Sequence, residues 1–230
     1  MSVPTMPIYV PPNDSSVLYP IIQSEIFPRK SLEYFIFLGT TALFICFSII
    51  NIFFPKIIRE FRFFTLLWTF VTSVSTASII TCLAKSYVGW PRPTMRTKCG
   101  PEANYTTCRL NGTKRDKEFI SWPSAHATEA GSAGVFVAFF VQAVFVEKNL
   151  LVSFVSAVLF LGFGVYVGGS RIKDFKHHPD DVTAGLLIGA GVSYFIWTNM
   201  KKKIFTVEKK PIEFAPEANE MHDVDQFDES

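Results

Sequence analysis

Residues 170–185 read S-R-I-K-D-F-K-H-H-P-D-D-V-T-A-G, and they join two apolar runs at residues 150–168 and 182–200. This stretch holds two histidines, three aspartates, two lysines and an arginine. Burying charged groups in a bilayer costs free energy, so those found beside membrane helices are usually paired or functional. We therefore take a functional cluster between two membrane helices as the hypothesis against which the rest of the chain is compared.

Five segments of this 230-residue chain are long and apolar enough to cross a membrane. They are residues 34–54, 63–84, 127–146, 150–168 and 182–200. A hydrocarbon core of ~30 Å needs about 20 apolar residues per helix, and a helix satisfies its own backbone groups there. The alternative, five buried helices of a soluble bundle, is disfavoured because apolar runs of this length are rare in soluble domains. The sequence predicts an all-α integral membrane bundle with about five transmembrane helices.

Composition divides the chain into three parts. Residues 1–30 hold six prolines and lack the basic region and apolar core of a signal peptide, so we expect an irregular outer segment. Residues 31–200 form the membrane domain. Residues 201–230 are basic and then acidic, with few apolar side chains, which is typical of a disordered cytosolic tail.

Lysines and arginines in the short connections predict the orientation. The connections at residues 55–62 and 147–149 are basic or tight, and three lysines follow the last span at residues 201–203. These segments should be cytosolic. The N-terminus and the loops 85–126 and 169–181 should then lie together on the lumenal or extracellular face, in the plasma membrane or an endomembrane.

Two features of the long loop agree with an outer location. Asn104 and Asn111 begin glycosylation sequons, which are used only on the lumenal side. Cys99 and Cys108 lie in the same loop, where oxidising conditions allow a disulfide. The sequence alone does not choose between this disulfide and four free thiols.

Three groups of residues in the outer loops have the chemistry of an anion site. Lys85 and Arg92 are cations near the membrane edge, although each could simply extend to lipid headgroups. Ser124 is a natural N-cap for the third span, where free backbone donors attract anions. His126 lies in the first turn after it, where a single histidine is more often structural than catalytic.

The third group lies in the opening stretch. Arg171 can form two hydrogen bonds with a phosphate. Asp181 follows His177 by one helical turn, so its carboxylate can hold one ring nitrogen and leave the other free to attack. His178 should project elsewhere and is interpreted as structural. Because no acidic cluster or Cys/His pair has metal-ligand spacing, the cations would take the place of a metal.

The three groups together resemble the signature motifs of the type 2 phosphatidic acid phosphatase (PAP2) superfamily, in particular its lipid phosphate phosphatase branch. The matching motifs are Lys85-x6-Arg92-Pro93, Pro123-Ser124-Ala125-His126 and Ser170-Arg171-x5-His177-x3-Asp181. The resemblance implies that His177 attacks phosphorus, Asp181 orients it, and His126 protonates the leaving alkoxide. It also implies that four residues bind the phosphoryl oxygens: Lys85, Arg92, Ser124 and Arg171.

This resemblance implies a membrane-embedded phosphatase domain at residues 31–200 that works without a metal or cofactor. Its partners would be the bilayer and a lipid phosphate, such as phosphatidate, lysophosphatidate, sphingosine phosphate or diacylglycerol pyrophosphate, and not a nucleic acid. A homo-oligomer stays open. Relatives in this branch usually have six spans, and this chain is expected to lack the first of them.

Two residues depart from the family pattern. Ala125 replaces the usual glycine, which would cost about 1 kcal/mol at a positive φ and nothing in a helix. Glu129 lies one turn beyond His126, where it could raise the pKa of that histidine or cap the helix start; we favour capping.

Three other functions stay open. A catalytically weak or silent relative would bind lipid or act as a scaffold, although no motif residue is lost here. A phosphotransferase would pass the phosphoryl group to a hydroxyl instead of water. A small transporter or channel would carry charges within its spans, where only Glu129 is found.

Overall fold

The computed structural model describes residues 10–22, 24–146 and 149–205, and the statements below concern these residues. Five helices are long and apolar enough to span a membrane: Arg29–Phe53, α3 (Phe63–Val88), α6 (Ala125–Val144), α7 (Leu150–Lys173) and α8 (Pro179–Phe205). The first consists of α1 (Arg29–Tyr34), a π-helical turn (Phe35–Gly39) and α2 (Thr40–Phe53). The short helices are a 3₁₀ turn (Ser15–Val17), α4 (Met95–Cys99) and α5 (Gly112–Glu118). The described residues contain no β-strand, which confirms the predicted all-α membrane bundle.

Two spans extend further than their apolar runs. The helix α3 continues to Val88 and includes Lys85, and α7 continues to Lys173 and includes Arg171. The predicted loops 85–126 and 169–181 were therefore too long, because hydropathy marks the hydrocarbon core and not the end of a helix. Residues 201–205, predicted as the start of the disordered tail, instead continue α8. The rest of the predicted tail and the first nine residues lie outside the described residues.

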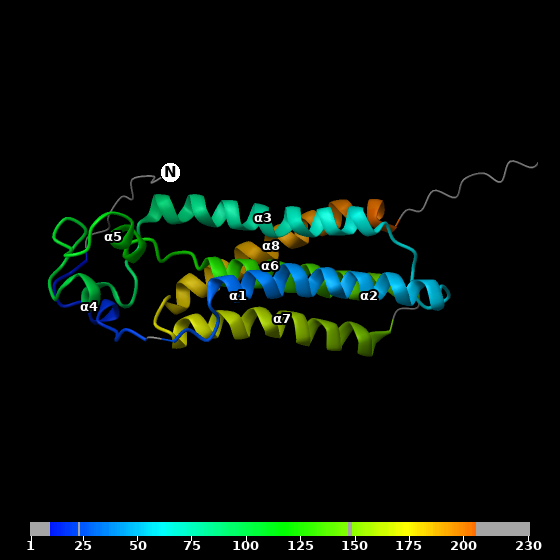
Figure 1. Cartoon of the computed structure of the whole chain (residues 1–230), viewed down its shortest axis with the longest axis horizontal. Helices are drawn as coiled ribbons and strands as arrows, with labels where there is room; N and C mark the ends of the chain where they lie inside the picture. The colour runs from blue at the N-terminus through cyan, green and yellow to red at the C-terminus, as the bar shows by residue number, and fades with distance from the viewer. Residues whose placement is uncertain (1–9, 23, 147–148, 206–230) are drawn as a thin grey trace, which may run out of the picture.

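The helix α6 lies at the centre of the bundle, and the other spans run along it (Figure 1). In its most apolar window 78% of the residues are buried, compared with 17% in α7 and 17% in the first span. Aromatic side chains fill the space around it. Phe44 and Phe140, for example, meet edge to face with ring centroids 5.0 Å apart. The exposed apolar side chains of the outer helices are those expected to contact lipid.

Small residues let α6 and α8 approach closely. A Cβ atom added at Gly189 would collide with the backbone carbonyl of Thr128, and one at Gly185 would lie 2.5 Å from the carbonyl oxygen of Ser124. Buried hydroxyls connect the same helices to α3, since Ser73 and Ser132 both hydrogen-bond to Ser193, at 2.6 and 2.8 Å. Close backbone contact and interhelical hydrogen bonds replace the hydrophobic effect as the attraction between helices in lipid.

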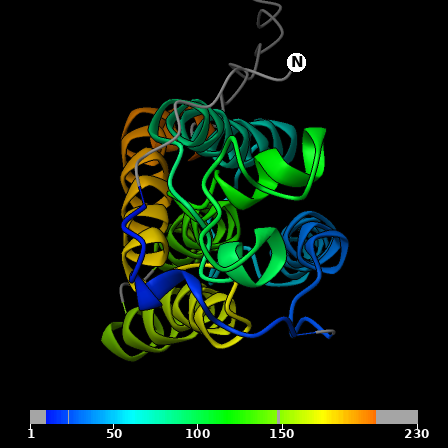
Figure 2. The same cartoon turned by 90° about the vertical axis from the view of Figure 1, so that its left-hand side faces the viewer.

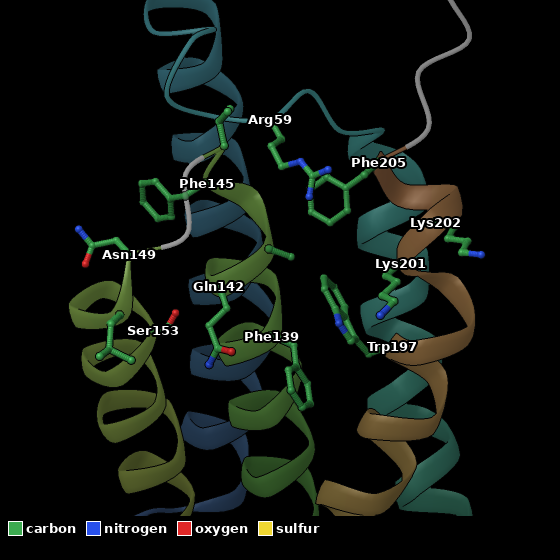
Figure 3. A pocket seen from close by; sticks show the side chains of 13 residues that line it. Arg59, Phe139, Gln142, Phe145, Asn149, Ser153, Trp197, Lys201, Lys202 and Phe205 are labelled. Carbon is green, nitrogen blue, oxygen red and sulfur yellow. The ribbon is translucent and has the colours of Figure 1, made fainter.

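The two ends of the bundle differ. At one end, here named the site end, residues 89–124 and the N-terminal segment cover the tips of the spans (Figure 2). Arg96 holds these two segments together by donating to the backbone carbonyls of Pro12 at 2.5 Å and Asp14 at 3.2 Å, and of Pro11. At the opposite end the connections are short, and a groove opens between α7 and α8 (Figure 3).

The close contact between α6 and α8 predicts different outcomes for two similar glycine substitutions. Gly189→Ala places its methyl group against Thr128, so we expect a loss of about 1–3 kcal/mol in the free energy of unfolding. Gly191→Ala, on the same helix, meets no atom within 4 Å and should cause no loss. Thermal unfolding of the purified variants in detergent measures the difference. Equal stability of the two variants would contradict the close packing.

Candidate active site

His177 and Asp181 form a buried pair at the start of α8. The connection from α7 is short, and Pro179 opens α8 as its first residue, as predicted. The Nδ1 atom of His177 lies 3.2 Å from Oδ2 of Asp181. The two side chains are 4% and 0% exposed, so water does not compete for this contact. The fold therefore joins the two residues that the sequence paired by their helical spacing.

The ring of His177 presents a free nitrogen. Its Nε2 atom has no hydrogen-bond partner within the described residues, while Nδ1 faces the carboxylate. Burial lowers the pKa of His177 well below its ordinary value, and this outweighs the raising effect of Asp181. The imidazole is therefore neutral at physiological pH. With the Nδ1 proton facing Asp181, the Nε2 lone pair is available for attack.

Ser121 also holds the carboxylate, and sequence reasoning did not single it out. Its Oγ donates to Oδ2 of Asp181 at 2.5 Å and lies 3.3 Å from Nδ1 of His177. No motif marks this serine, because the contact joins positions 60 residues apart in the chain. Its oxygen fixes the orientation of the pair.

Lys85 and Arg92 turn back onto the protein. The ammonium of Lys85 donates to the carbonyls of Ile120 and Ser121, at 3.0 and 2.8 Å. The guanidinium of Arg92 donates to the carbonyls of Lys117 and Lys176, at 2.7 and 2.8 Å. Extension of these cations to lipid headgroups, the alternative considered above, is not what the structure shows.

Each of the two cations keeps an unused donor. Lys85 has three N–H groups and uses two of them within the described residues. The Nη2 atom of Arg92 likewise has no partner there. Both side chains are therefore held in place while a donor remains for an anion.

Ser124 occupies the N-cap position of α6, as predicted, but its side chain does not cap the helix. Its Oγ atom is buried without a hydrogen-bond partner within the described part of the chain, and so is Nε2 of His126 in the first turn of the same helix. The backbone N–H of Ser124 donates to the carbonyl of Asp181 at 2.9 Å, which places the start of α6 beside the start of α8. Buried polar atoms are nearly always paired, so unpaired ones at a helix start suggest a place for a ligand.

The structure resolves the two departures from the family pattern. Ala125 is the first residue of α6 and is not among the residues with positive φ, so the alanine carries no backbone strain. Glu129 does not cap the helix, which corrects the favoured interpretation. Its Oε1 atom accepts from Ser78 at 3.3 Å and from Arg29 at 3.4 Å. The carboxylate was available for these partners because α3 and α1 pack beside it.

Arg171 is buried among acceptors that the motif did not predict. Its guanidinium donates to Glu25 at 3.1 Å, to Asp174 at 3.5 Å and to the carbonyl of Phe27 at 2.9 Å. Its Nε atom is buried without a partner in the described residues. Burial would raise the pKa of Glu25, but Lys176 and Arg171 outweigh it and hold that pKa below its ordinary value. The N-terminal segment thus brings a carboxylate to the predicted phosphate-binding arginine.

His178 does not project away from the site, contrary to expectation. Its backbone N–H donates to Oδ2 of Asp181 at 2.8 Å, and its Nδ1 atom lies 3.5 Å from the same oxygen. The reason is that the chain turns into α8 at this residue, which brings its ring back over the first helical turn. His178, Asp180 and Asp181 place ligand-type atoms within 4.8 Å of one another, although no metal-ligand group was expected from spacing. One oxygen of Asp181 in this group is already engaged by His177 and Ser121.

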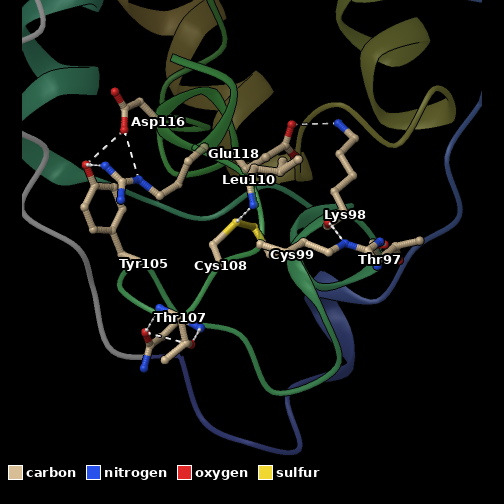
Figure 4. Close-up of a disulfide and its surroundings, with 12 residues drawn as sticks. Thr97, Lys98, Cys99, Tyr105, Thr107, Cys108, Leu110, Asp116 and Glu118 are labelled. Atoms are coloured by element: carbon tan, nitrogen blue, oxygen red, sulfur yellow. Dashed lines mark hydrogen bonds and ion pairs between the residues drawn. A yellow bond between two sulfur atoms is a disulfide. The ribbon is translucent and has the colours of Figure 1, made fainter. Parts of the chain in front are cut away.

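The loop over the site end is held together by covalent and polar contacts (Figure 4). Cys99 and Cys108 form a disulfide in the structure. Lys98 pairs with the buried carboxylate of Glu118 at 2.7 Å, and the backbone carbonyl of Glu118 accepts from the backbone N–H of Arg92. The two sequon asparagines, Asn104 and Asn111, are exposed, and their glycosylation stays a prediction.

The comparisons with known proteins follow the same region. The model of the PAP2 superfamily matches residues 66–205. Human phospholipid phosphatase 2 is 31% identical over 141 residues, 56% of this chain and 49% of that protein. Mouse phospholipid phosphatase 1 is 30% identical over 140 residues, with 55% and 49% covered. Human phospholipid phosphatase-related protein type 4 is 28% identical over 144 residues, with 55% and 18% covered.

No solved structure matches the chain. The chain spans about half the length of the two phospholipid phosphatases and about a fifth of the type 4 protein. The family match includes α6, α7, α8 and nearly all of α3, which together hold Lys85, Ser124 at a helix start, His126, Arg171 and Asp181. Since it extends over more than half of the 230 residues, this chain belongs to the PAP2 superfamily.

Proposed function

We propose that this protein is a membrane-embedded lipid phosphate phosphatase that hydrolyses phosphomonoesters through a phosphohistidine. The observation that carries the proposal is the buried His177–Asp181 pair, whose outer ring nitrogen is free. In the first step Nε2 of His177 bonds to phosphorus and the bond from phosphorus to the lipid oxygen breaks. The leaving oxygen takes a proton from His126.

The second step regenerates the enzyme. A water molecule attacks phosphorus while His126 takes a proton from that water. The bond between phosphorus and Nε2 of His177 breaks, and inorganic phosphate is released. The developing charge on the phosphoryl oxygens would be stabilised by preorganised donors. The candidates are the unused donors of Lys85, Arg92 and Arg171 and the unpaired hydroxyl of Ser124.

The orientation of the site belongs to this proposal. Basic residues lie at the end of the bundle opposite the site, in the connection from α2 to α3 and at the end of α8. By the positive-inside rule this end faces the cytosol. The catalytic domain would then act on lipids of the lumenal or extracellular leaflet, with the end of α8 and residues 206–230 on the cytosolic side. Phosphatidate, lysophosphatidate, sphingosine phosphate and diacylglycerol pyrophosphate are the proposed substrate class.

A second candidate function rests on Glu25. Its carboxylate accepts from Arg171, the arginine expected to bind phosphate. A member of the family that keeps this contact would be catalytically weak or silent and would act as a lipid-binding or scaffold protein. Transfer of the phosphoryl group to a lipid or sugar hydroxyl would use the same phosphohistidine, and product analysis distinguishes it from hydrolysis.

Substitution of the proposed nucleophile tests the proposal. We expect His177→Asn to reduce phosphate release from micellar phosphatidate in EDTA by about 10³-fold or more, because no intermediate can form. Lys173→Gln is the matched control, since Lys173 is an exposed cation four residues before His177 and outside the site. Equal rates for the wild type and His177→Asn would exclude His177 as nucleophile. A strict requirement for metal, or insensitivity to vanadate, would contradict the mechanism.

The buried environment of His177 also predicts a pH profile. The neutral ring is the nucleophile, and its pKa lies below 6.5, so protonation removes it only at a pH lower than that value. We expect kcat/KM to lose its nucleophile-dependent activity only below pH 6.5. Repeating the profile with a lipid phosphate that ionises at a different pH distinguishes ionisation of the enzyme from ionisation of the substrate. A fall in activity on acidification that sets in at or above pH 6.5, and that is the same for both substrates, would contradict the assigned state of the ring.

A further inference from the structure

The groove at the end of the bundle opposite the site has features of a binding site. It has a volume of about 850 Å³, large enough for a small ligand. Its walls come from α6, α7 and α8 and from the connection before α3 (Figure 3). The lining residues that matter here are Arg59, Phe139, Gln142, Trp197, Lys201 and Phe205.

The floor of the groove is aromatic. The rings of Phe139 and Trp197 stack with centroids 6.2 Å apart, and Phe205 meets Trp197 edge to face at 6.3 Å. Trp197 is itself only 4% exposed, so its position is fixed by packing. Such a surface at the level of a membrane helix suits an acyl chain.

The rim of the groove is cationic. Arg59 is fixed by its backbone N–H, which donates to the carbonyl of Val144 at 2.7 Å, and its guanidinium lies over the ring of Phe205 at 5.5 Å. Lys201 extends toward the groove from α8 in the close-up view (Figure 3). None of the described lining residues is acidic. The described part of the lining therefore carries positive charge and no carboxylate.

A polar group lies between the rim and the floor. Gln142 is within the membrane span α6, and its amide points into the groove (Figure 3). Its side chain makes no hydrogen bond to any other described residue. An amide in a span is costly unless it finds a partner, and the ester and glycerol oxygens of a lipid are suitable acceptors.

The simpler interpretation is that lysines at the end of α8 only stabilise the helix dipole and face water. That interpretation explains Lys201 and Lys202, which lie in or near the last turn. It does not explain Arg59, which reaches the same groove from a different segment, or Gln142 below it. Convergence of cations from two elements above an aromatic floor is the arrangement expected for an anionic headgroup.

We propose that this groove binds one anionic glycerophospholipid from the surrounding leaflet. Its phosphodiester would contact Arg59 and Lys201, its ester oxygens would accept from Gln142, and an acyl chain would lie along Phe139 and Trp197. This site is separate from the site end and does not depend on the proposed phosphatase activity. A phosphodiester is also not the phosphomonoester expected at His177.

Trp197 provides the readout. Substituting Phe for Trp68, Trp90 and Trp122 leaves Trp197 as the only tryptophan of the full-length chain. Phosphatidylglycerol brominated close to its ester groups, added to the purified protein in detergent, should quench this tryptophan at lower concentration than brominated phosphatidylcholine. In Arg59→Gln/Lys201→Gln the concentration of phosphatidylglycerol needed for half-quenching should rise about tenfold or more.

Two further variants serve as controls. Lys203→Gln removes a neighbouring exposed lysine that does not line the groove, and the preference for phosphatidylglycerol should persist in it. Equal quenching by the two lipids, or an unchanged preference in the double variant, would overturn the proposal. So would an equal loss in Lys203→Gln, which would indicate diffuse surface charge. A preference seen only after Glu208, Glu213, Glu217 and Glu220 are changed to Gln would assign the groove to the acidic tail instead.

Discussion

The contact between the first turns of α6 and α8 is the constraint on which the rest of the site depends. The backbone N–H of Ser124 donates to the carbonyl of Asp181, and Gly185 lies against the carbonyl of Ser124 without room for a side chain. Two helix starts are thereby held side by side at one end of a membrane bundle. One presents His126 and the unpaired hydroxyl of Ser124, and the other presents His177 and Asp181. Without this contact the proposed acid, His126, and the proposed nucleophile, His177, would not face the same phosphoryl group.

Features that depend on residues close together in the chain were predictable from the sequence, whereas features that depend on contacts between helices were not. Long apolar runs predict the spans, and the four-residue spacing of His177 and Asp181 predicts their pairing, because both patterns are local. Ser121 and Glu25 were missed because their partners are 60 and 146 residues away. The role of Glu129 was misjudged for the same reason, since its partners come from other helices. Interactions between helices have no signal in a single sequence.

The cations of the site end are held by partners within the described residues. Arg171 finds Glu25 and Asp174, while Lys85 and Arg92 find backbone carbonyls. Buried cations need such partners, because an unpaired charge away from water is costly. The partners differ in kind, however. A neutral carbonyl leaves a cation able to bind a phosphoryl oxygen as well. The negatively charged carboxylate of Glu25 would instead compete with a phosphoryl oxygen for Arg171.

This competition bears on how the proposed site could admit a substrate. Glu25 belongs to the N-terminal segment, and it also pairs with Lys176, next to the proposed nucleophile. A phosphomonoester that reaches Arg171 must displace the carboxylate or share the guanidinium with it, and repulsion between the two anions favours displacement. The side chain of Glu25 is 31% exposed, whereas that of Arg171 is 3% exposed. The carboxylate of Glu25 is therefore the group that can move into water. The arginine can then stay in place, held by Asp174 and the carbonyl of Phe27, while the anion beside it is exchanged.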